Sequence, residues 1–405
     1  IIIIAGLIGF FMAFGIGAND VANAMGTSVG SKAITLKQAV IIAAIFEFLG
    51  AYFAGGEVTS TIRKGIVDPS IYSDDVNIFI IGMLSSLLAA GLWLLMASSK
   101  GWPVSTTHSI VGAIVGFVLI SKGASNVSWG TVGGIASSWI TSPLVSGLMA
   151  FLLYLSAKHL ILDRNNPTKA AVSVIPFYSF FVTAVICLVT ARKGLKHVGI
   201  NWTDNEIYLF TFVLSLLVSV FTFLFLFFKS SKLSPNVENQ FGILMIITAC
   251  AMAFAHGSND VANAIGPIAA VVSIVTSDGT IQTSSELNSW VLLLGAVGIV
   301  FGLAILGRHV IKTVGEKITT LTPSLGFSAN MATASTVLAA SYLGFPISTT
   351  HTLVGGVIGV GLARGYKYLD LNSIKRIFLS WIITIPVGAT FTILFYVILR
   401  LIFNV

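Results

Sequence analysis

The sequence predicts an all-α polytopic membrane protein, with two inverted structural repeats, broken helices or helical hairpins at a central site, and roughly 11–12 transmembrane segments. Hydrophobic residues make up 56% of the chain and charged residues 9%, against about 25% charged in a soluble domain. The apolar runs are continuous, whereas a membrane barrel would alternate. Two motifs occur twice, about half the chain apart.

The first half begins with an apolar run from Ile1 to about Val29 that contains the motif Gly17 to Ala24. A second candidate span, about Gln38 to Ala54, carries Glu47 near its middle. After a polar stretch, a third candidate span covers about Val76 to Ser98. Amide and carboxylate groups inside such runs lie at membrane depth, where polar groups are costly and usually functional.

The second motif, Pro103 to His108, opens the next apolar segment, which reaches about Ile120. Proline followed by hydroxyl residues is typical of a helix start, because proline suits the first turn and Ser or Thr oxygens cap free amides. The long apolar stretch from Trp129 to Leu162 contains Pro143, which predicts a kinked span.

Two plain spans follow, at 170–190 and 207–228, and we interpret them as scaffold helices. The segment 229–240 is the main central linker, after which the features of the first half recur. We therefore divide the chain into a first repeat at 1–162, intervening scaffold helices and linker at 163–240, and a second repeat at 241–405.

The recurrence involves three features in one order. Gly17 to Ala24 reappears as Gly257 to Ala264, Pro103 to His108 as Pro346 to His351, and the sequence around Trp139 more weakly around Trp381. An internal duplication of this kind is typical of secondary transporters whose site lies between the repeats. The number of crossings leaves a parallel arrangement open; broken helices at corresponding positions favour inversion.

The first motif offers ligands for a hard cation such as sodium. On a helix, Asn19, Asp20 and Asn23 share a face, and their twins are Asn259, Asp260 and Asn263. Glycines beside each motif would let the helix break and expose carbonyl oxygens, which suit such a cation. The alternative is that these side chains only bridge helices.

The second motif offers an anion site. Its hydroxyl residues stand at predicted helix N-termini, where free amides and the helix dipole favour negative charge. They are Ser105, Thr106, Thr107, Ser348, Thr349 and Thr350. Neither motif contains Lys or Arg. An oxyanion there needs a co-bound cation for neutralisation, which predicts symport; ordinary helix capping is the alternative.

Glu47 has no carboxylate twin, since the matched Gly50 and Gly302 place Ile299 opposite it, and we expect it to act as a further cation ligand or a protonatable group. The histidines of the motifs, His108, His351 and His256, are interpreted as hydrogen-bonded structural residues, with proton relay as the alternative.

Several other classes of protein do not fit the sequence. Cys187 and Cys250 lie inside apolar runs, which excludes a disulfide framework and a cysteine metal site. Lys and Arg cluster between apolar runs as interfacial residues, which argues against a nucleic-acid partner. An intramembrane hydrolase lacks a nucleophile motif, and an anion channel has no use for paired Asn-Asp sites.

The two duplicated motifs, together with Thr61 to Ile66, resemble the inorganic phosphate transporter family, PiT, over essentially the whole chain. The resemblance implies a symporter of inverted repeats, driven by sodium in many members and by protons in others, and a homodimer. It implies phosphate binding by Asp20, Asn23, Asp260 and Asn263 with the six motif hydroxyls, and a transport role for Glu47. The short central linker resembles prokaryotic members, which implies an inner membrane.

The sequence as a whole predicts a transporter, not an enzyme, that imports inorganic phosphate with sodium by alternating access. It needs no cofactor beyond sodium as coupling ion, and its partners are phosphate, sodium and the lipid bilayer. The predicted sodium ligands are Asn19, Asp20, Asn23, Glu47, Asn259, Asp260 and Asn263. Proton coupling and sulfate as substrate remain the alternatives.

Overall fold

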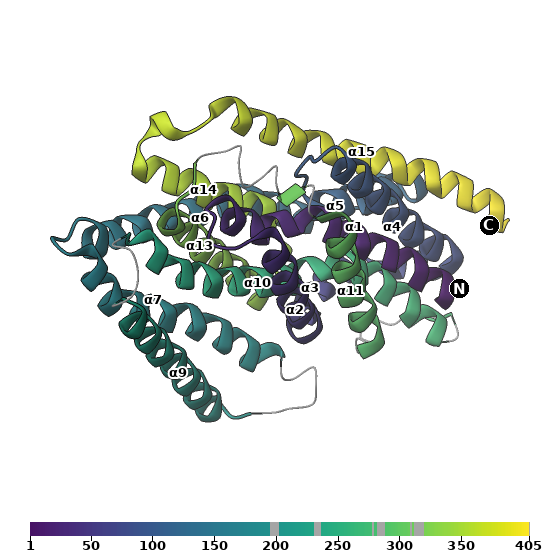
Figure 1. Cartoon of the computed structure of the whole chain (residues 1–405). Helices are drawn as coiled ribbons and strands as arrows, with labels where there is room; N and C mark the ends of the chain where they lie inside the picture. Colours follow the sequence, from purple (N-terminus) through teal and green to yellow (C-terminus); the bar gives the residue numbers. More distant parts are fainter. Residues whose placement is uncertain are drawn as a thin grey trace.

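A computed structural model describes residues 1–194, 202–230, 236–277, 279–281, 288–307, 310–311 and 320–404, and within them it leaves the side chains of residues 22, 23, 64, 193, 194, 229 and 230 undescribed. Every regular element in these ranges is helical (Figure 1). The helices of the first half are α1 (Ile2–Gly30), α2 (Leu36–Ala54), α3 (Gly56–Lys64), α4 (Val76–Ser99), α5 (Thr106–Ser121), α6 (Trp129–Ala157) and α7 (Pro167–Val189). Those that follow are α9 (Asp204–Ser230), α10 (Glu238–Thr276), α11 (Ser289–Gly302), α13 (Pro323–Tyr342), α14 (Thr349–Arg364) and α15 (Leu371–Phe403).

Short helical turns extend or connect these helices. Three-residue or four-residue 3₁₀ turns lie at Pro69–Tyr72, Ala124–Asn126 and Tyr366–Tyr368. Helices α6, α7 and α11 each continue into one π-helical turn, at Lys158–Leu162, Thr190–Gly194 and Leu303–Gly307. The polar stretch after α2 is therefore largely helical as well, since it contains α3.

In the part of the chain that the structure describes, nine helices are long and apolar enough to cross a membrane, by length and composition. The number is below the expected 11–12 because α13, with 20 residues, is less apolar than the nine, and because the helices that begin at the Pro-x-Ser-Thr-Thr-His motifs are short. Helices α5 and α14 have 16 residues each, short of the ~20 that a helix needs to span the hydrocarbon.

Each half-length helix forms a hairpin with the helix before it. Helix α4 ends at Ser99 and α5 begins at Thr106, and α13 ends at Tyr342 before α14 begins at Thr349. The two helices of each hairpin pack on each other. The expected hairpins at corresponding positions are thus present, and the interruption of the helical path falls at the Ser-Thr-Thr motif.

Helices α1 and α10, by contrast, continue without a break through the Asn-Asp motifs, so the expectation that glycine breaks them there is wrong. The glycines permit contact between backbones instead. A Cβ on Gly17 would lie 1.9 Å from the carbonyl oxygen of Ile299, and one on Gly257 would lie 2.3 Å from that of Glu47. Only glycine allows so close an approach.

The same backbone contacts occur in both halves. A Cβ on Gly302 would meet the Phe14 carbonyl oxygen at 1.9 Å, and one on Gly50 would meet that of Phe254 at 2.0 Å. Helix α1 therefore packs on α11 as α10 packs on α2. Likewise α6 packs on the α13–α14 hairpin, and α15 on the α4–α5 hairpin. Helices of each half therefore pack mainly against helices of the other half.

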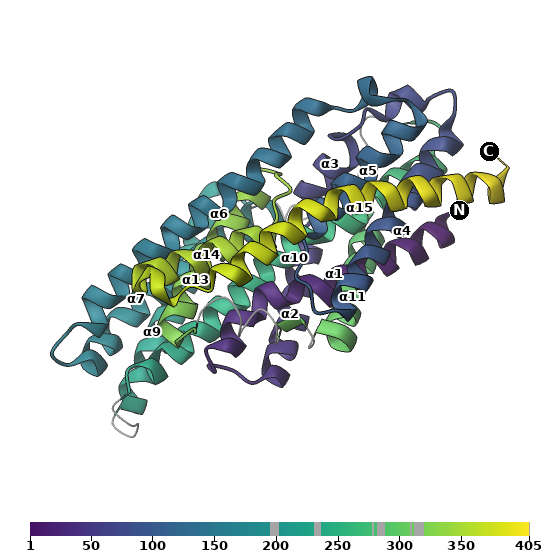
Figure 2. The ribbon, with the colours of Figure 1, turned by 90° about the horizontal axis from the view of Figure 1, so that it is seen from above.

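Helices α1 and α10, which carry the two copies of the first motif, run in opposite directions. Gly9, near the start of α1, lies against Ile268, near the end of α10, whereas Asp20 lies beside Asp260. Figures 1 and 2 show α1 and α10 side by side in the middle of the molecule. Antiparallel packing of equivalent spans is the arrangement expected of inverted repeats.

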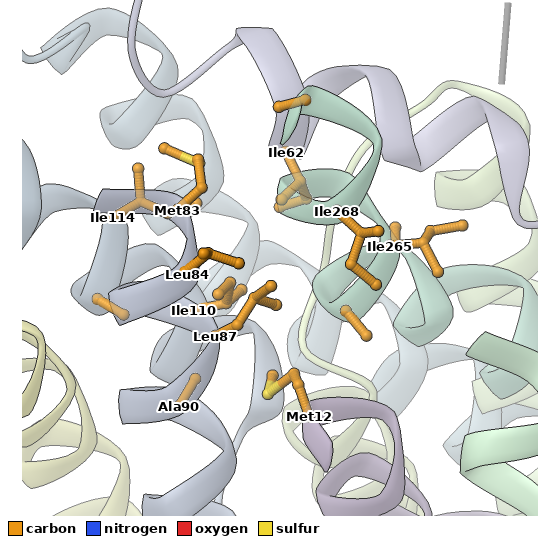
Figure 3. Packing of buried hydrophobic residues seen from close by; sticks show 14 of the residues in the cluster. Met12, Ile62, Met83, Leu84, Leu87, Ala90, Ile110, Ile114, Ile265 and Ile268 are labelled. Carbon is orange, nitrogen blue, oxygen red and sulfur yellow. The ribbon is translucent and has the colours of Figure 1, made fainter. Parts of the chain in front are cut away.

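Two apolar cores flank this centre. In the first, side chains of α1, α3, α4, α5 and α10 meet, as Figure 3 shows for Met12, Ile62, Leu87, Ile110 and Ile268. The second core joins α2, α6, α7, α10, α13 and α14. Helices α7 and α9, within the segment predicted as scaffold, form a pair at one edge of the molecule (Figure 1), and the large apolar side chains of α9 are mostly exposed.

We expect Gly17→Ala to destabilise the protein, because the added methyl group overlaps the Ile299 carbonyl and forces α1 and α11 apart. Overpacking of this kind costs about 1–3 kcal/mol, which a lower midpoint of thermal unfolding in detergent would show. Gly242→Ala is the matched control, since no atom lies within 4 Å of a Cβ at this position of α10. Equal unfolding midpoints for the two variants would contradict the packing argument.

Candidate functional site

The two Ser-Thr-Thr motifs form buried helix N-termini, as the sequence predicts. The side chain of Ser105 accepts a hydrogen bond from the backbone amide of His108 at 3.2 Å, and Ser348 accepts one from His351 at 3.2 Å. Ser105 and Ser348 cap α5 and α14 respectively. Both helices thus begin inside the protein, with their positive dipole ends toward its centre.

Asn19 holds the turn of the first hairpin in place. Its Nδ2 donates to Ser98 Oγ at 3.1 Å and to the Trp102 carbonyl at 3.0 Å, while its Oδ1 accepts from the Val104 amide at 3.1 Å. One side chain therefore bonds both the buried Val104 amide and the partly buried Trp102 carbonyl of the turn. Such bonds matter at depth because water cannot replace them.

Asn259 makes the same three bonds in the second half. Its Nδ2 donates to Ser341 Oγ at 3.0 Å and to the Phe345 carbonyl at 3.2 Å, and its Oδ1 accepts from the Ile347 amide at 3.3 Å. Sodium ligation by the two asparagines stays a prediction. Their bonds to the hairpin turns show that they position the Ser-Thr-Thr motifs.

The tips of the two hairpins bind each other across the repeats. Thr107 Oγ1 donates to the Ile347 carbonyl at 2.9 Å, and Thr350 Oγ1 donates to the Val104 carbonyl at 3.3 Å. Each threonine therefore satisfies the backbone just before the partner motif. The reciprocal bonds bring the starts of α5 and α14 together.

The two aspartates lie beside these tips. The single proton of the Thr350 hydroxyl is shared between the Val104 carbonyl and Asp20 Oδ1, which is the nearer acceptor at 2.9 Å, and Thr349 Oγ1 donates to Asp260 Oδ2 at 2.7 Å. Oxygen atoms of Asp20 and Asp260 and a ring nitrogen of His256 lie within 4.8 Å of one another. Both aspartates are at most 1% exposed. Two carboxylates from opposite repeats thus share one buried site with the helix N-termini.

Asn263 contacts the first hairpin. Its Nδ2 donates to Thr106 Oγ1 and to Thr107 Oγ1, both at 3.2 Å. The structure therefore brings together every predicted phosphate-binding residue except Asn23, whose side chain lies outside the described residues. Their roles in phosphate binding stay predictions.

Three buried oxygen atoms of this region have no hydrogen-bond partner among the residues that the structure describes: Asp260 Oδ1, Glu47 Oε1 and Asn263 Oδ1. Buried acceptors without partners are rare, because losing water costs roughly 1–3 kcal/mol or more per group. Carboxylate and amide oxygens are also the ligands that hard cations take. The donor set fits a sodium ion.

The histidines at the ends of the Ser-Thr-Thr motifs have structural partners, in accordance with the interpretation of the sequence. His108 Nδ1 lies 3.3 Å from the Trp381 carbonyl oxygen, and His351 Nδ1 lies 3.1 Å from that of Trp139. Pro143 lacks the amide that would bond the Trp139 carbonyl in α6, and His351 supplies that bond. The ring of His351 also stacks on Trp381, with 3.4 Å between centroids.

His256 has a different environment, which the sequence analysis did not predict. Its Nδ1 lies 2.7 Å from Glu47 Oε2 and its Nε2 lies 2.9 Å from Asp260 Oδ2. The available signal was the spacing of His256 and Asp260, four residues apart on one helix face. Ser98 and Ser341 were also missed, although they recur at the offset of Ser105 and Ser348.

Comparison with known proteins decides the family. Residues 16–392 match the model of the phosphate transporter family. The chain belongs to this family. A protein of Haemophilus influenzae that is 52% identical, over 99% of this chain and 97% of its own length, carries the provisional name of a phosphate permease. A chloroplast inorganic phosphate transporter of Arabidopsis thaliana is 43% identical over 96% of this chain and 70% of its own length.

A solved structure described as the sodium-dependent phosphate transporter matches this fold with a TM-score of 0.89. It is 43% identical, and the match covers 99% of both chains. The chain is therefore a multi-span membrane protein of a transporter family and not an enzyme. The resemblance found in the two duplicated motifs is confirmed.

We expect Asn259→Ala to loosen the second hairpin, because it removes the acceptor of the Ile347 amide and two donors to the turn. At about 1 kcal/mol for each net hydrogen bond, amide exchange over 343–348 should accelerate about tenfold or more. Hydrogen-exchange mass spectrometry measures this directly. Asn77→Ala, at an exposed position, is the control, and unchanged exchange in Asn259→Ala would refute the positioning role.

Proposed function

We propose that this protein imports inorganic phosphate by symport with sodium ions, by alternating access around the site between the two repeats. The observation that supports it best is the pair of buried carboxylates, Asp20 and Asp260, that meets two buried helix N-termini and their threonine hydroxyls. Carboxylates offer charge to cations, and the helix starts offer donors to an anion.

The balance of charge supports cotransport. A phosphate dianion between two aspartates gives about four negative charges, and two helix N-termini contribute only about one positive charge. No Lys or Arg occurs within either motif. Sodium ions bound by carboxylate and amide oxygens would neutralise the remaining negative charge. The solved relative described as sodium-dependent supports the same choice of ion.

The hydroxyl groups suit a tetrahedral oxyanion. Thr106, Thr107, Thr349 and Thr350 come from two helices that face one site from opposite repeats. A hydroxyl can rotate to donate to phosphate or to a protein acceptor. The bonds now made to Asp20 and Asp260 can therefore be exchanged for bonds to phosphate.

The same construction supports alternating access. The site is buried, and each side of it is formed by a hairpin of one repeat packed on a helix of the other. Rocking of such units around a fixed site opens it to one side at a time. In keeping with the resemblance, we place the protein in a prokaryotic inner membrane and propose that it forms a homodimer.

Proton coupling is the second candidate, because His256 lies against two carboxylates at the site. Labelled phosphate uptake into proteoliposomes, with sodium and proton gradients imposed separately, distinguishes the two. We expect uptake to follow the sodium gradient. Uptake that follows only the proton gradient would assign the protein to the proton-coupled members.

Asp20→Asn and Asp260→Asn should each lower sodium-driven uptake by roughly 30-fold or more. Loss of one buried, hydrogen-bonded charge costs about 2 kcal/mol or more, and each substitution keeps the shape of the side chain. Uptake is compared at equal amounts of folded protein, with the exposed Asp74→Asn as control. Normal transport in either variant would remove that residue from the site.

Sulfate is the alternative substrate, since it is tetrahedral too. Phosphate can donate a hydrogen bond to Asp20 or Asp260, whereas sulfate at neutral pH cannot. Sites that pair with a substrate hydroxyl reject analogues that lack it by large factors. We expect sulfate to leave most phosphate uptake intact at ~100-fold excess, and strong competition would favour a sulfate permease.

A further inference from the structure

The two halves of the site differ at one contact. In the second half, His256 of α10 bridges Glu47 of α2 and Asp260 of α10, at 2.7 Å and 2.9 Å, and all three side chains are fully buried. At the corresponding positions of the first half stand Ile16, Ile299 and Asp20. The contact of Asp260 with a His–Glu pair therefore has no counterpart at the twin positions beside Asp20.

The backbone contacts show that these positions correspond in space as well as in sequence. Gly257 meets the Glu47 carbonyl oxygen in the same way as Gly17 meets that of Ile299. Helices α10 and α2 thus approach each other as α1 and α11 do. The difference lies in the side chains alone, so it cannot be ascribed to a different packing of the helices.

Hydrogen-bond chemistry defines what the contact does. A carboxylate oxygen only accepts, and both ring nitrogens of His256 face carboxylate oxygens. Nδ1 is hydrogen-bonded to Glu47 Oε2, whereas Nε2 meets Asp260 Oδ2 in a close polar contact that lies outside hydrogen-bond geometry. Asp260 Oδ2 accepts from Thr349. Oδ2 is therefore contacted by both His256 and Thr349, whereas Oδ1 has no hydrogen-bond partner among the described residues.

We propose that His256 is a positioning residue through which Glu47 acts on Asp260, so that the two aspartates of the duplicated motif are not equivalent. His256 and Thr349 both contact Oδ2 of Asp260, whereas the positions beside Asp20 that correspond to His256 and Glu47 carry Ile16 and Ile299. Glu47 also ties α2 to the site, because any displacement of α2 along α10 breaks its contact with His256. The consequence for sodium binding rests on the proposed symport function.

A double-mutant cycle tests this mechanism. Glu47→Gln, His256→Gln and the double variant are compared for the sodium concentration that gives half-maximal phosphate uptake. We expect each single variant to need about tenfold more sodium for half-maximal uptake, with a smaller change in the phosphate KM. The double variant should need no more sodium than the single variant that needs more. Additive effects would overturn the proposal.

Two further variants distinguish a positioning role of His256 from a general disruption of the structure. His256→Leu removes both ring nitrogens, so it should lose more sodium affinity than His256→Gln, whose amide can still donate to a carboxylate. In the His256→Leu background, Glu47→Gln should have no further effect on sodium affinity. Ile299→Val, at the twin position of Glu47, is the matched control and should keep wild-type sodium dependence.

The same cycle on thermal unfolding, without sodium or phosphate, keeps the inference independent of transport. If wild-type protein shows no sodium-driven uptake, the proposed function fails, while non-additive shifts of the unfolding midpoint for Glu47→Gln and His256→Gln still support the bridge. Additive shifts together with additive sodium effects would show that Glu47 does not act through His256.

Discussion

Burial of Asp20 and Asp260 is the constraint on which the rest of the centre depends. Removing a carboxylate from water costs several kcal/mol even after the protein relaxes, and both side chains are at most 1% exposed. Threonine hydroxyls and two buried helix N-termini oppose that cost. The turns of the two hairpins, where α5 and α14 begin, must therefore lie beside the aspartates. Asn19 and Asn259, which bind the hairpin turns, secure that position from the residues directly before each aspartate.

The second constraint is steric, and it comes from the glycines of the motifs. Gly17 and Gly257 permit backbone contact between α1 and α11 and between α10 and α2. Without a hydrophobic driving force between helices in lipid, such close packing is what holds spans together. These contacts join one repeat to the other, as do the contacts of α6 and α15 with the hairpins. For this reason, neither half of the chain forms the site alone.

The duplication has kept the backbone and changed some side chains. Asn330 donates to Ser28 Oγ at 3.2 Å and also contacts Thr27, all buried between α1 and α13. By the offset between Ser98 and Ser341, the counterpart of Asn330 is Leu87, which packs in the apolar core that contains Ile268 (Figure 3). The bridge from Glu47 through His256 to Asp260 is a second difference of this kind. In both cases polar side chains stand where the counterpart positions carry apolar ones: Leu87 opposite Asn330, and Ile299 and Ile16 opposite Glu47 and His256.

The sequence by itself determined the class of the protein, the duplicated motifs, the capping of α5 and α14 by Ser105 and Ser348, and the family. These properties depend on local chemistry: apolar length, capping hydroxyls and repetition along the chain. The sequence also located Asp20, Asp260 and Glu47 as polar groups at depth, and it identified Ile299 as the twin of Glu47.

Only the tertiary structure decided what those groups contact. That Thr350 binds Asp20, that His256 joins Glu47 to Asp260, and that Gly17 serves a backbone contact and not a helix break all depend on pairs of residues distant in the chain. The physical reason is that hydrogen bonding and close packing depend on distance and direction in space. A motif specifies the groups that can bond, and the packing of one repeat against the other selects their partners.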